Sequence, residues 1–251
     1  MAQKYYVVWK GRETGVFNDW ASCKKHIDHF PGARYKSFKT QNEAEAAFKG
    51  SPGTPASGQS SVKKKPGVKT YTATDIESIE VDTKIYTDGG CEPNPGEAGS
   101  GLAVYRDEHI SELWYGLYNP KGTNNTAELN ALFQAMVMAE DEFKKQRSVA
   151  IFCDSKYSIQ CVTQWAAGWE KKGWKKAGGE IKNLGLIQEM YALYQTLKAQ
   201  IQILHVNGHI GVEGNELADR MSILAIEKQD PDFVRYTGKL NIPEILATRR
   251  G

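Results

Sequence analysis

The order of apolar segments between residues 84 and 228 is the feature that most constrains the fold of this 251-residue chain. Three strand-like segments follow one another closely, as in a meander. After them, segments with helical periodicity alternate with short apolar strands, and strands joined through helices run parallel. The expected elements are strands at 84–87, 100–106, 109–118, 149–153 and 201–206, helices at 126–144, 155–166, 183–199 and 214–227, and a basic loop or helix at 168–182. This order predicts an α/β fold with a five-stranded mixed sheet flanked by helices.

A segment rich in Ser, Gly, Pro and Lys divides the chain into two folded parts. Residues 51–82, which include "SPGTPASGQSSVKKKPG", have the composition of a flexible linker. Residues 1–50 precede the linker and predict a small α+β domain. Residues 83–228 form the main domain. Residues 229–251 form a C-terminal tail whose pattern indicates neither a structure nor a role.

The small N-terminal domain is predicted from turn and cap signals. "KYYVVWKGRETGVF" has two short apolar runs around a turn, which is typical of a β-hairpin. A helix is expected between the cap Asp19 and the stop at Pro31, and "ARYKSF" is a third strand. Thr40 and Glu43 have the spacing of a capping box at the start of a second helix.

Composition and charge fit a globular protein but do not identify a partner. Apolar residues make up 40%, charged residues 25%, and the formal net charge is only +2, so a preference for nucleic acid must come from local charge. The four cysteines, Cys23, Cys91, Cys153 and Cys161, include no CxxC pair, which is typical of reduced thiols. The chain starts almost directly with a strand-like segment, and no apolar run reaches about 18 residues. We therefore expect a cytoplasmic protein without membrane contact.

Four carboxylates lie where separate elements of the predicted sheet come together. Asp88 and Asp154 each end an apolar strand, and the glycines and the Pro-Asn-Pro-Gly turn after Asp88 predict a flexible loop. Sites in α/β sheets form beyond the carboxyl ends of strands. Glu128 lies near the start of a helix, and Asp219 lies one turn into the last helix, on its inner side. Such like charges are costly unless a cation neutralises them, and oxygen ligands suit Mg²⁺ or Mn²⁺. Each acid alone is also typical of a turn, a helix start or a solvated face, so the prediction depends on all four.

The residues around these acids resemble a known family. "YTDGGCEPNPG", "TNNTAEL", "FCDSKY" and "GHIGVEGNELAD" occur in this order, and together they resemble type 1 ribonuclease H over residues 84–228. The resemblance implies an endoribonuclease that hydrolyses the RNA strand of RNA/DNA hybrids and leaves 3′-hydroxyl and 5′-phosphate ends. It further implies that two Mg²⁺ ions, for which Mn²⁺ can substitute, are bound by the family's catalytic carboxylates, which match Asp88, Glu128, Asp154 and Asp219. His209 matches a mobile-loop histidine that assists proton movement or product release.

The same resemblance implies a set of residues that recognise the substrate. RNA differs from DNA in its 2′-hydroxyl group, so the site needs groups that contact it. The matching positions for this contact are Gly90, Cys91, Asn94, Asn124 and Asn125. Thr123 matches a position that contributes to a pocket for a DNA phosphate. Glycine and asparagine are also common turn formers, which leaves that alternative open.

A basic segment with interleaved tryptophans, "TQWAAGWEKKGWKKAGGEIKN", matches the family's basic protrusion, which grips the DNA strand. Lysines neutralise phosphates, and aromatic rings pack on sugars or bases. A charge run is also typical of a solvated face, and Trp at helical spacing is typical of a core, so we expect at least one tryptophan to be structural. The expected nucleic-acid-binding residues are Trp165, Trp169, Lys171, Lys172, Trp174 and Lys175.

Residues 4–49 resemble the hybrid-binding domain found at the front of many eukaryotic-type ribonucleases H. Trp20 and Tyr35 match aromatics expected to stack on DNA sugars, and Lys36 matches a neighbouring lysine. Ser37 stands where relatives often have a second lysine, which predicts reduced affinity. Trp20 and Tyr35 could instead pack in a small core. The resemblance implies binding of RNA/DNA hybrid and also of double-stranded RNA, and a second binding site on a linker predicts greater processivity.

Two other functions compete with a hybrid-specific ribonuclease. The first is a different nuclease on the same fold, such as an exonuclease, integrase or resolvase, against which "NGHIGVEGNELAD" and the basic segment argue. The second is a non-catalytic protein that binds RNA/DNA hybrid or double-stranded RNA. Its signature would be a missing carboxylate, and all four are present. We expect the chain to act as a monomer.

Overall fold

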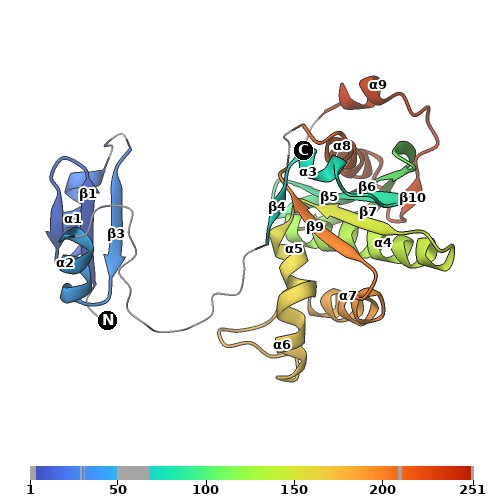
Figure 1. Ribbon diagram of the computed structural model, residues 1–251. Helices are drawn as coiled ribbons and strands as arrows, with labels where there is room; N and C mark the ends of the chain where they lie inside the picture. The colour runs from blue at the N-terminus through green and yellow to red at the C-terminus, as the bar shows by residue number, and fades with distance from the viewer. Residues whose placement is uncertain (1–3, 29, 31, 50–67, 209–210, 250–251) are drawn as a thin grey trace. The chain divides into compact units, whose positions relative to one another are not determined.

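The computed structural model describes residues 4–28, 30, 32–49, 68–208 and 211–249. The chain divides into two units, Met1–Lys65 and Pro66–Gly251, each with its own sheet and apolar core (Figure 1). The linker expected at 51–82 lies outside the described residues as far as residue 67. No helix within the described ranges combines the length and the apolar composition that crossing a membrane would require.

The first unit is an antiparallel three-stranded sheet with two helices. Its strands are β1 (Tyr5–Lys10), β2 (Gly15–Phe17) and β3 (Arg34–Phe38), in the order β2-β1-β3. The helices are α1 (Trp20–Ile27) and α2 (Gln41–Lys49). Asp19 caps α1, Thr40 and Glu43 exchange hydrogen bonds at the start of α2, and Val8, Cys23 and Ile27 form the core. The expected small α+β domain is confirmed.

The second unit is built on a mixed sheet with the strand order β10-β7-β6-β5-β8-β9-β4. β5, β6 and β7 form the antiparallel meander, and β8 and β9 add to β5 in parallel. These five strands are the sheet that the sequence predicts, and two short strands, β4 and β10, extend its edges. The bounds are β4 (Thr70–Tyr71), β5 (Thr83–Glu92), β6 (Gly96–Arg106), β7 (His109–Gly122), β8 (Val149–Cys153), β9 (Gln202–Val206) and β10 (Val234–Arg235).

Helices cover both faces of this sheet because successive strand residues point to opposite sides. Ile85 and Ile151 face a cluster that includes α4 and α7, whereas Tyr86 and Phe152 face a cluster that includes α8. The mixed α/β architecture with helices on both sides is therefore confirmed (Figure 1). The helices are α3 (Ala73–Glu77), α4 (Asn124–Lys144), α5 (Lys156–Gln160), α6 (Ala166–Glu170), α7 (Leu184–Leu197), α8 (Glu213–Lys228) and α9 (Ile242–Leu246).

We expected strand β5 to end at Asp88. Instead it continues to Glu92, in register with β6. The first half of the expected flexible loop is therefore paired strand, and only the turn between β5 and β6 forms the tip of the hairpin. Its glycines serve close packing, since a Cβ at Gly89 would lie 2.2 Å from the backbone nitrogen of Glu128. On β6, a Cβ at Gly101 would lie 2.2 Å from the carbonyl oxygen of Ala218. The missing side chains let α4 and α8 lie directly on the sheet.

Two segments without a clear sequence pattern are part of the second unit. The structure contradicts the linker prediction for residues 70–77, which form β4 and the capped helix α3, and Ile76 is buried. The C-terminal tail forms β10 and α9, and Ile245 is buried. Their pairing depends on tertiary contacts with β9, β7 and α8 rather than on local periodicity.

The helix that leads into the basic segment also differs from its prediction. The helix expected at 155–166 is interrupted: α5 passes through a π-helical turn (Cys161–Trp165) into α6, which ends at Glu170. The following residues, 171–183, are mainly turns. Gly173, Gly178 and Gly179 have positive φ angles of 63°, 101° and 110°, which glycine adopts without strain and which prevent a continued helix.

Candidate active site

The four predicted carboxylates line one cavity of about 260 Å³. Asp88 comes from β5, Asp154 follows β8, Glu128 lies in the second turn of α4, and Asp219 lies in α8. The structure therefore brings together all four acids from four elements distant in sequence. The remaining lining residues are Gly89, Gly90, Cys91 and Asn124.

Sheet register explains the position of the two aspartates. β5 and β8 are parallel neighbours, and Thr87 pairs with Cys153. The next residue on each strand is an acid, Asp88 or Asp154, so the two acids lie adjacent at the same edge of this strand pair. The register therefore confirms the expected juxtaposition of these aspartates, although β5 itself extends further.

Burial and like charge disfavour the ionised forms of two of these acids. Asp88 and Glu128 are each only 6% exposed. Burial, followed by the negative charges of Asp154 and Asp219, raises the pKa of Asp88 well above its usual value. Burial, followed by the charges of Asp88 and Asp154, raises the pKa of Glu128 in the same way. A bound cation would reverse this repulsion.

The donor set fits a hard divalent cation. Ligand atoms of Glu128, Cys153 and Asp154 lie within 4.8 Å of one another. Within the described part of the chain, Oε2 of Glu128 is buried and has no hydrogen-bond partner. Cys153 is fully buried and does not line the cavity, so the Cys153 thiol is not part of the donor set that the cavity presents. The four acids present carboxylate oxygens there. Carboxylate oxygens are the ligands that Mg²⁺ and Mn²⁺ prefer.

Residues that support the acids were missed by the sequence reasoning. The hydroxyl of Ser222 lies 3.1 Å from Oδ2 of Asp88, and Nδ2 of Asn215 donates to Oδ2 of Asp154 at 3.4 Å. Asn215 and Ser222 lie four residues before and three residues after Asp219, so both share its helix face. That spacing around Asp219 was the available signal.

Two further supporting contacts come from buried cationic or titratable side chains. His205, on β9, lies with Nε2 3.1 Å from the carbonyl oxygen of Asp154 and with Nδ1 2.9 Å from Oγ1 of Thr70. Burial lowers the pKa of His205. Arg220 forms a buried ion pair with Asp219. No sequence signal indicated these two roles. The second partner of His205 lies on β4, and the second partner of Arg220 lies on α9, and neither element has a sequence pattern.

The predicted 2′-hydroxyl contacts are brought together around the same cavity. Gly90, Cys91 and Asn124 line it, and Oδ1 of Asn94 accepts a hydrogen bond from the backbone nitrogen of Asn124 at 3.3 Å. Asn125 is exposed in the first turn of α4. These positions are compatible with contacts to a nucleic acid, and their roles stay predictions.

Thr123 has a clear structural role. Its side chain caps α4 by accepting from the backbone nitrogen of Thr126 at 3.2 Å. The hydroxyl of Thr126 in turn donates to Oδ1 of Asn183 at 3.0 Å. The predicted phosphate contact of Thr123 stays a prediction beside this capping role.

His209 lies outside the described residues. Its neighbour Gly208 passes close to the site, since a Cβ there would lie 2.7 Å from Oδ2 of Asp154.

The basic segment separates into half-buried aromatics and exposed lysines. Trp165, Trp169 and Trp174 are half-buried and pack against the main core. The rings of Trp174 and Tyr191 are 6.0 Å apart, edge to face. We expected at least one structural tryptophan, and all three pack against the core. Their contact with nucleic acid stays a prediction. The expected phosphate contacts Lys171, Lys172 and Lys175 are exposed.

The predicted binding residues of the first unit share an exposed surface. Trp20 and Tyr35 are 44% and 48% exposed, with ring centroids 5.8 Å apart. Lys36 is exposed on β3, and its Nζ lies 5.6 Å from the ring centre of Phe38. The alternative that Trp20 and Tyr35 fill the core is not supported, because Val8, Cys23 and Ile27 form it.

Comparisons with known proteins identify the family of both units. Residues 80–227 match the RNase H family, and residues 4–48 match the Ribonuclease H1 N-terminal domain. The chain is 32% identical to Ribonuclease H1 of Mus musculus over 255 residues, which covers 87% of each chain. It is 38% identical to Ribonuclease H of Acidovorax sp. (strain JS42) over 145 residues, or 57% of this chain and 94% of that protein.

A solved structure shows the same fold. LC9-RNase H1, described as a type 1 RNase H with the type 2 active-site motif, is similar with a TM-score of 0.51 and 23% identity, covering 65% of this chain and 84% of that one. The chain therefore belongs to the ribonuclease H family, as a type 1 enzyme with an N-terminal hybrid-binding domain. It is an endoribonuclease.

Proposed function

We propose that the chain hydrolyses the RNA strand of RNA/DNA hybrids and leaves 3′-hydroxyl and 5′-phosphate ends. The observation that carries this proposal is the convergence of Asp88, Glu128, Asp154 and Asp219 on one cavity beside Gly90, Cys91 and Asn124. The acids supply a cation site, and the adjoining backbone and amide groups are placed to contact an RNA sugar.

The four carboxylates would hold two divalent ions, Mg²⁺ or in its place Mn²⁺. Ions held by these residues would supply activation of water and stabilisation of charge on the departing oxygen. The buried Oε2 of Glu128 and the raised pKa values of Glu128 and Asp88 support this assignment, because a cation satisfies the first and favours ionisation of both groups.

The first unit would hold the hybrid while the second unit cleaves it. Trp20 and Tyr35 offer exposed aromatic faces, and Lys36 offers a charge beside them. We propose that this surface binds RNA/DNA hybrid and also double-stranded RNA, and that it raises processivity on long hybrids by keeping the substrate near the active site. The chain would act as a monomer.

The test is cleavage of an end-labelled RNA/DNA hybrid by the full chain with Mg²⁺ or Mn²⁺. RNA/RNA, DNA/DNA and single-stranded RNA run beside it. Asp154→Asn should abolish cleavage, whereas Asp141→Asn, which removes an exposed acid on α4, should leave it unchanged. Products should accept a 5′ label only after phosphatase treatment and should be extended by a polymerase from the 3′ end.

Other outcomes would identify a different function. Tight hybrid binding without cleavage would indicate the non-catalytic alternative. Cleavage of DNA/DNA would indicate another nuclease of the same fold. The role of the first unit is tested in the Asp154→Asn background, where Trp20→Ala should weaken binding to both hybrid and double-stranded RNA. Equal binding to double-stranded RNA with and without Trp20→Ala would refute that part.

A further inference from the structure

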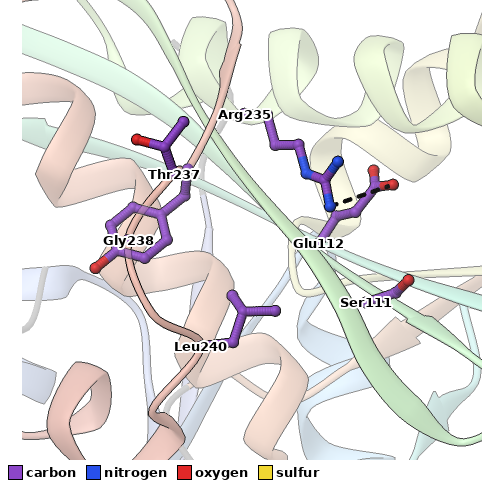
Figure 2. A pocket seen from close by; sticks show the side chains of 7 residues that line it. Ser111, Glu112, Arg235, Thr237, Gly238 and Leu240 are labelled. Carbon is purple, nitrogen blue, oxygen red and sulfur yellow. Dashed lines mark ion pairs between the residues drawn. The ribbon is translucent and has the colours of Figure 1, made fainter.

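The C-terminal tail, residues 229–249, lies beyond the matched residues 80–227 and yet packs on the second unit. β10 pairs with β7, and the ring of Phe233 stacks on Trp114 with centroids 5.8 Å apart. Beyond β10 the chain passes a cavity of about 350 Å³, where Arg235 lies 3.9 Å from Glu112 (Figure 2). The tail then forms α9, which contacts α8.

Arg220 connects this tail to the active site. It is 3% exposed and directly follows Asp219 on α8. One guanidinium nitrogen, Nη1, donates to Oδ2 of Asp219. The other, Nη2, donates to the carbonyl oxygen of Leu246 at 3.2 Å. A single planar group therefore joins a carboxylate of the site to the last residue of α9.

The two contacts of Arg220 together fix the orientation of its guanidinium group. The guanidinium is rigid, so fixing Nη2 also fixes the direction in which Nη1 points. The last carbonyl groups of a helix have no intrahelical partner, and a cation at that end is favourable. Without α9, Nη2 would lose its only partner within the described residues. Nη1 would keep Asp219 and the carbonyl oxygen of Glu216 at 3.5 Å, both on α8, so the guanidinium would be fixed at one end only.

A second contact joins the tail to the strand that carries Asp88. Arg249 forms an ion pair with Glu92, the last residue of β5. Both side chains are exposed, so this pair adds little stability on its own. It shows that the tail spans from α8, which carries Asp219, to the strand that carries Asp88.

We propose that Arg220 is a positioning residue for the catalytic carboxylate Asp219, and that the C-terminal tail, through α9, holds Arg220 in place. Arg220 itself touches no substrate in this scheme. It holds Oδ2 of Asp219, so that the orientation of the carboxylate toward the cavity is fixed before substrate binds. Misplacement of a catalytic group by about 1 Å can lower a rate on the order of 100-fold. This inference rests on the proposed hydrolysis of RNA/DNA hybrids.

The test compares full-length variants for kcat and KM on hybrid at saturating Mg²⁺. Arg220→Gln removes both contacts, and Arg220→Lys keeps the charge without the planar fork. Ile245→Asp places a charge in the buried contact of α9, and Ala247→Asp places the same charge on the exposed side of its end. Arg106→Gln is the matched control, since Arg106 also forms partly buried ion pairs, with Glu112 and Glu142, away from the site.

We expect Arg220→Gln and Ile245→Asp each to lower kcat by about 10-fold or more, with KM within about 2-fold, because the substrate-binding surfaces are unchanged. Arg220→Lys should fall between Arg220→Gln and the wild type. Ala247→Asp and Arg106→Gln should keep kcat within about 2-fold, even where the melting temperature of Arg106→Gln drops. The double variant Arg220→Gln with Ile245→Asp should be no slower than Arg220→Gln alone, because α9 acts through Arg220.

Hydrogen exchange supplies a readout that does not depend on activity. The backbone nitrogens of Ile245 and Ala247 donate to the carbonyl oxygens of Asn241 and Pro243, in α9 and its cap residues. If Arg220 and α9 hold each other, these amides should exchange faster in Arg220→Gln and Arg220→Lys than in the wild type or in Arg106→Gln.

Three outcomes would overturn the inference: unchanged exchange in α9, a kcat for Arg220→Gln equal to that of Arg106→Gln, or losses that multiply in the double variant. A wild-type chain that does not cleave hybrid would instead refute the proposed function, and the exchange comparison would still decide whether Arg220 holds α9.

Discussion

Replacing Asp88 by Asn should stabilise the metal-free chain while abolishing cleavage. Asp88 is buried, and its pKa is raised by burial and by the charges of Asp154 and Asp219. Asn has nearly the same shape and can still contact the hydroxyl of Ser222, which lies 3.1 Å from Oδ2. The substitution therefore removes a poorly compensated charge without leaving a cavity. We expect a gain of about 1 kcal/mol or more, because one unit of raised pKa corresponds to about 1.4 kcal/mol.

Glu142 provides the matched control because it is a buried carboxylate in the opposite environment. Its Oε1 accepts from Arg106 and from Lys145, each at 3.0 Å, and its Oε2 accepts from Thr83 at 3.2 Å. Although burial alone would raise it, the hydrogen bonds from Arg106 and Lys145 hold the pKa of Glu142 below its usual value. Glu142→Gln should therefore destabilise the chain by about 1.5 to 3 kcal/mol, the value of hydrogen bonds to a charged group.

Thermal denaturation in a chelator, with and without added Mg²⁺, measures both effects. One kcal/mol corresponds to about 2 to 4 °C for a domain of this size. Mg²⁺ at 100 times its dissociation constant should add about 2.7 kcal/mol to the wild type and less to Asp88→Asn, which lacks one ligand. Glu142→Gln should respond to Mg²⁺ like the wild type.

The pH dependence provides an independent check. Since Asp88 and Glu128 have raised pKa values, these two groups bind more protons in the folded metal-free chain than in the unfolded chain. The contribution of these groups to stability is fully present below the usual carboxyl pKa of about 4 and is lost as pH rises through the raised values. Asp88→Asn should flatten this fall. A metal-free Asp88→Asn chain that melts at or below the wild type would refute the electrostatic reasoning.

Three further predictions concern the binding surfaces and the packing of β5. Trp20→Ala or Tyr35→Ala should weaken hybrid binding, measured by fluorescence anisotropy, by about 1 to 3 kcal/mol without lowering the melting temperature, because both rings are exposed; a lower melting temperature would assign them to the core. Lys171→Ala should raise KM and reduce the slope of log affinity against log salt by about 1, whereas Trp174→Ala should lower the melting temperature; an unchanged slope would place Lys171 away from phosphate. Gly89→Ala should destabilise the chain by about 3 kcal/mol or more, since its Cβ would lie 2.2 Å from the backbone of Glu128; a normal denaturation midpoint would mean that α4 can shift.

The main elements and the four acids could be predicted because their signals are local. Helical and strand periodicities predicted the succession of the five central strands and the long helices along the chain. The residues flanking the acids indicated the active site. β4 and β10 could not be found in this way, because two residues cannot show a period. Their positions are set by β9 and β7, to which they pair.

The glycines of β5 show a second limit of sequence reasoning. Gly89 and Gly90, followed by a Pro-Asn-Pro-Gly turn, favoured a flexible loop. The sequence does not distinguish a glycine in a flexible loop from a glycine that allows a helix to pack closely. Only the positions of α4 and α8 separate the two interpretations. The supporting roles of His205 and Arg220 were hidden for a related reason, since their partners Thr70 and Leu246 belong to segments without a pattern.

The two short edge strands have a consequence for the solubility of shortened forms of the second unit. The backbone of residues 230–236 follows β7, where Tyr118 donates to Asp230 and Tyr236 donates to Leu113. An unpaired strand edge is a template for pairing between molecules. A fragment limited to residues 80–227 would expose the edges of β7 and β9 together with the apolar surfaces that Ile76 and Ile245 cover. Such a fragment should aggregate at concentrations at which residues 68–249 stay dispersed.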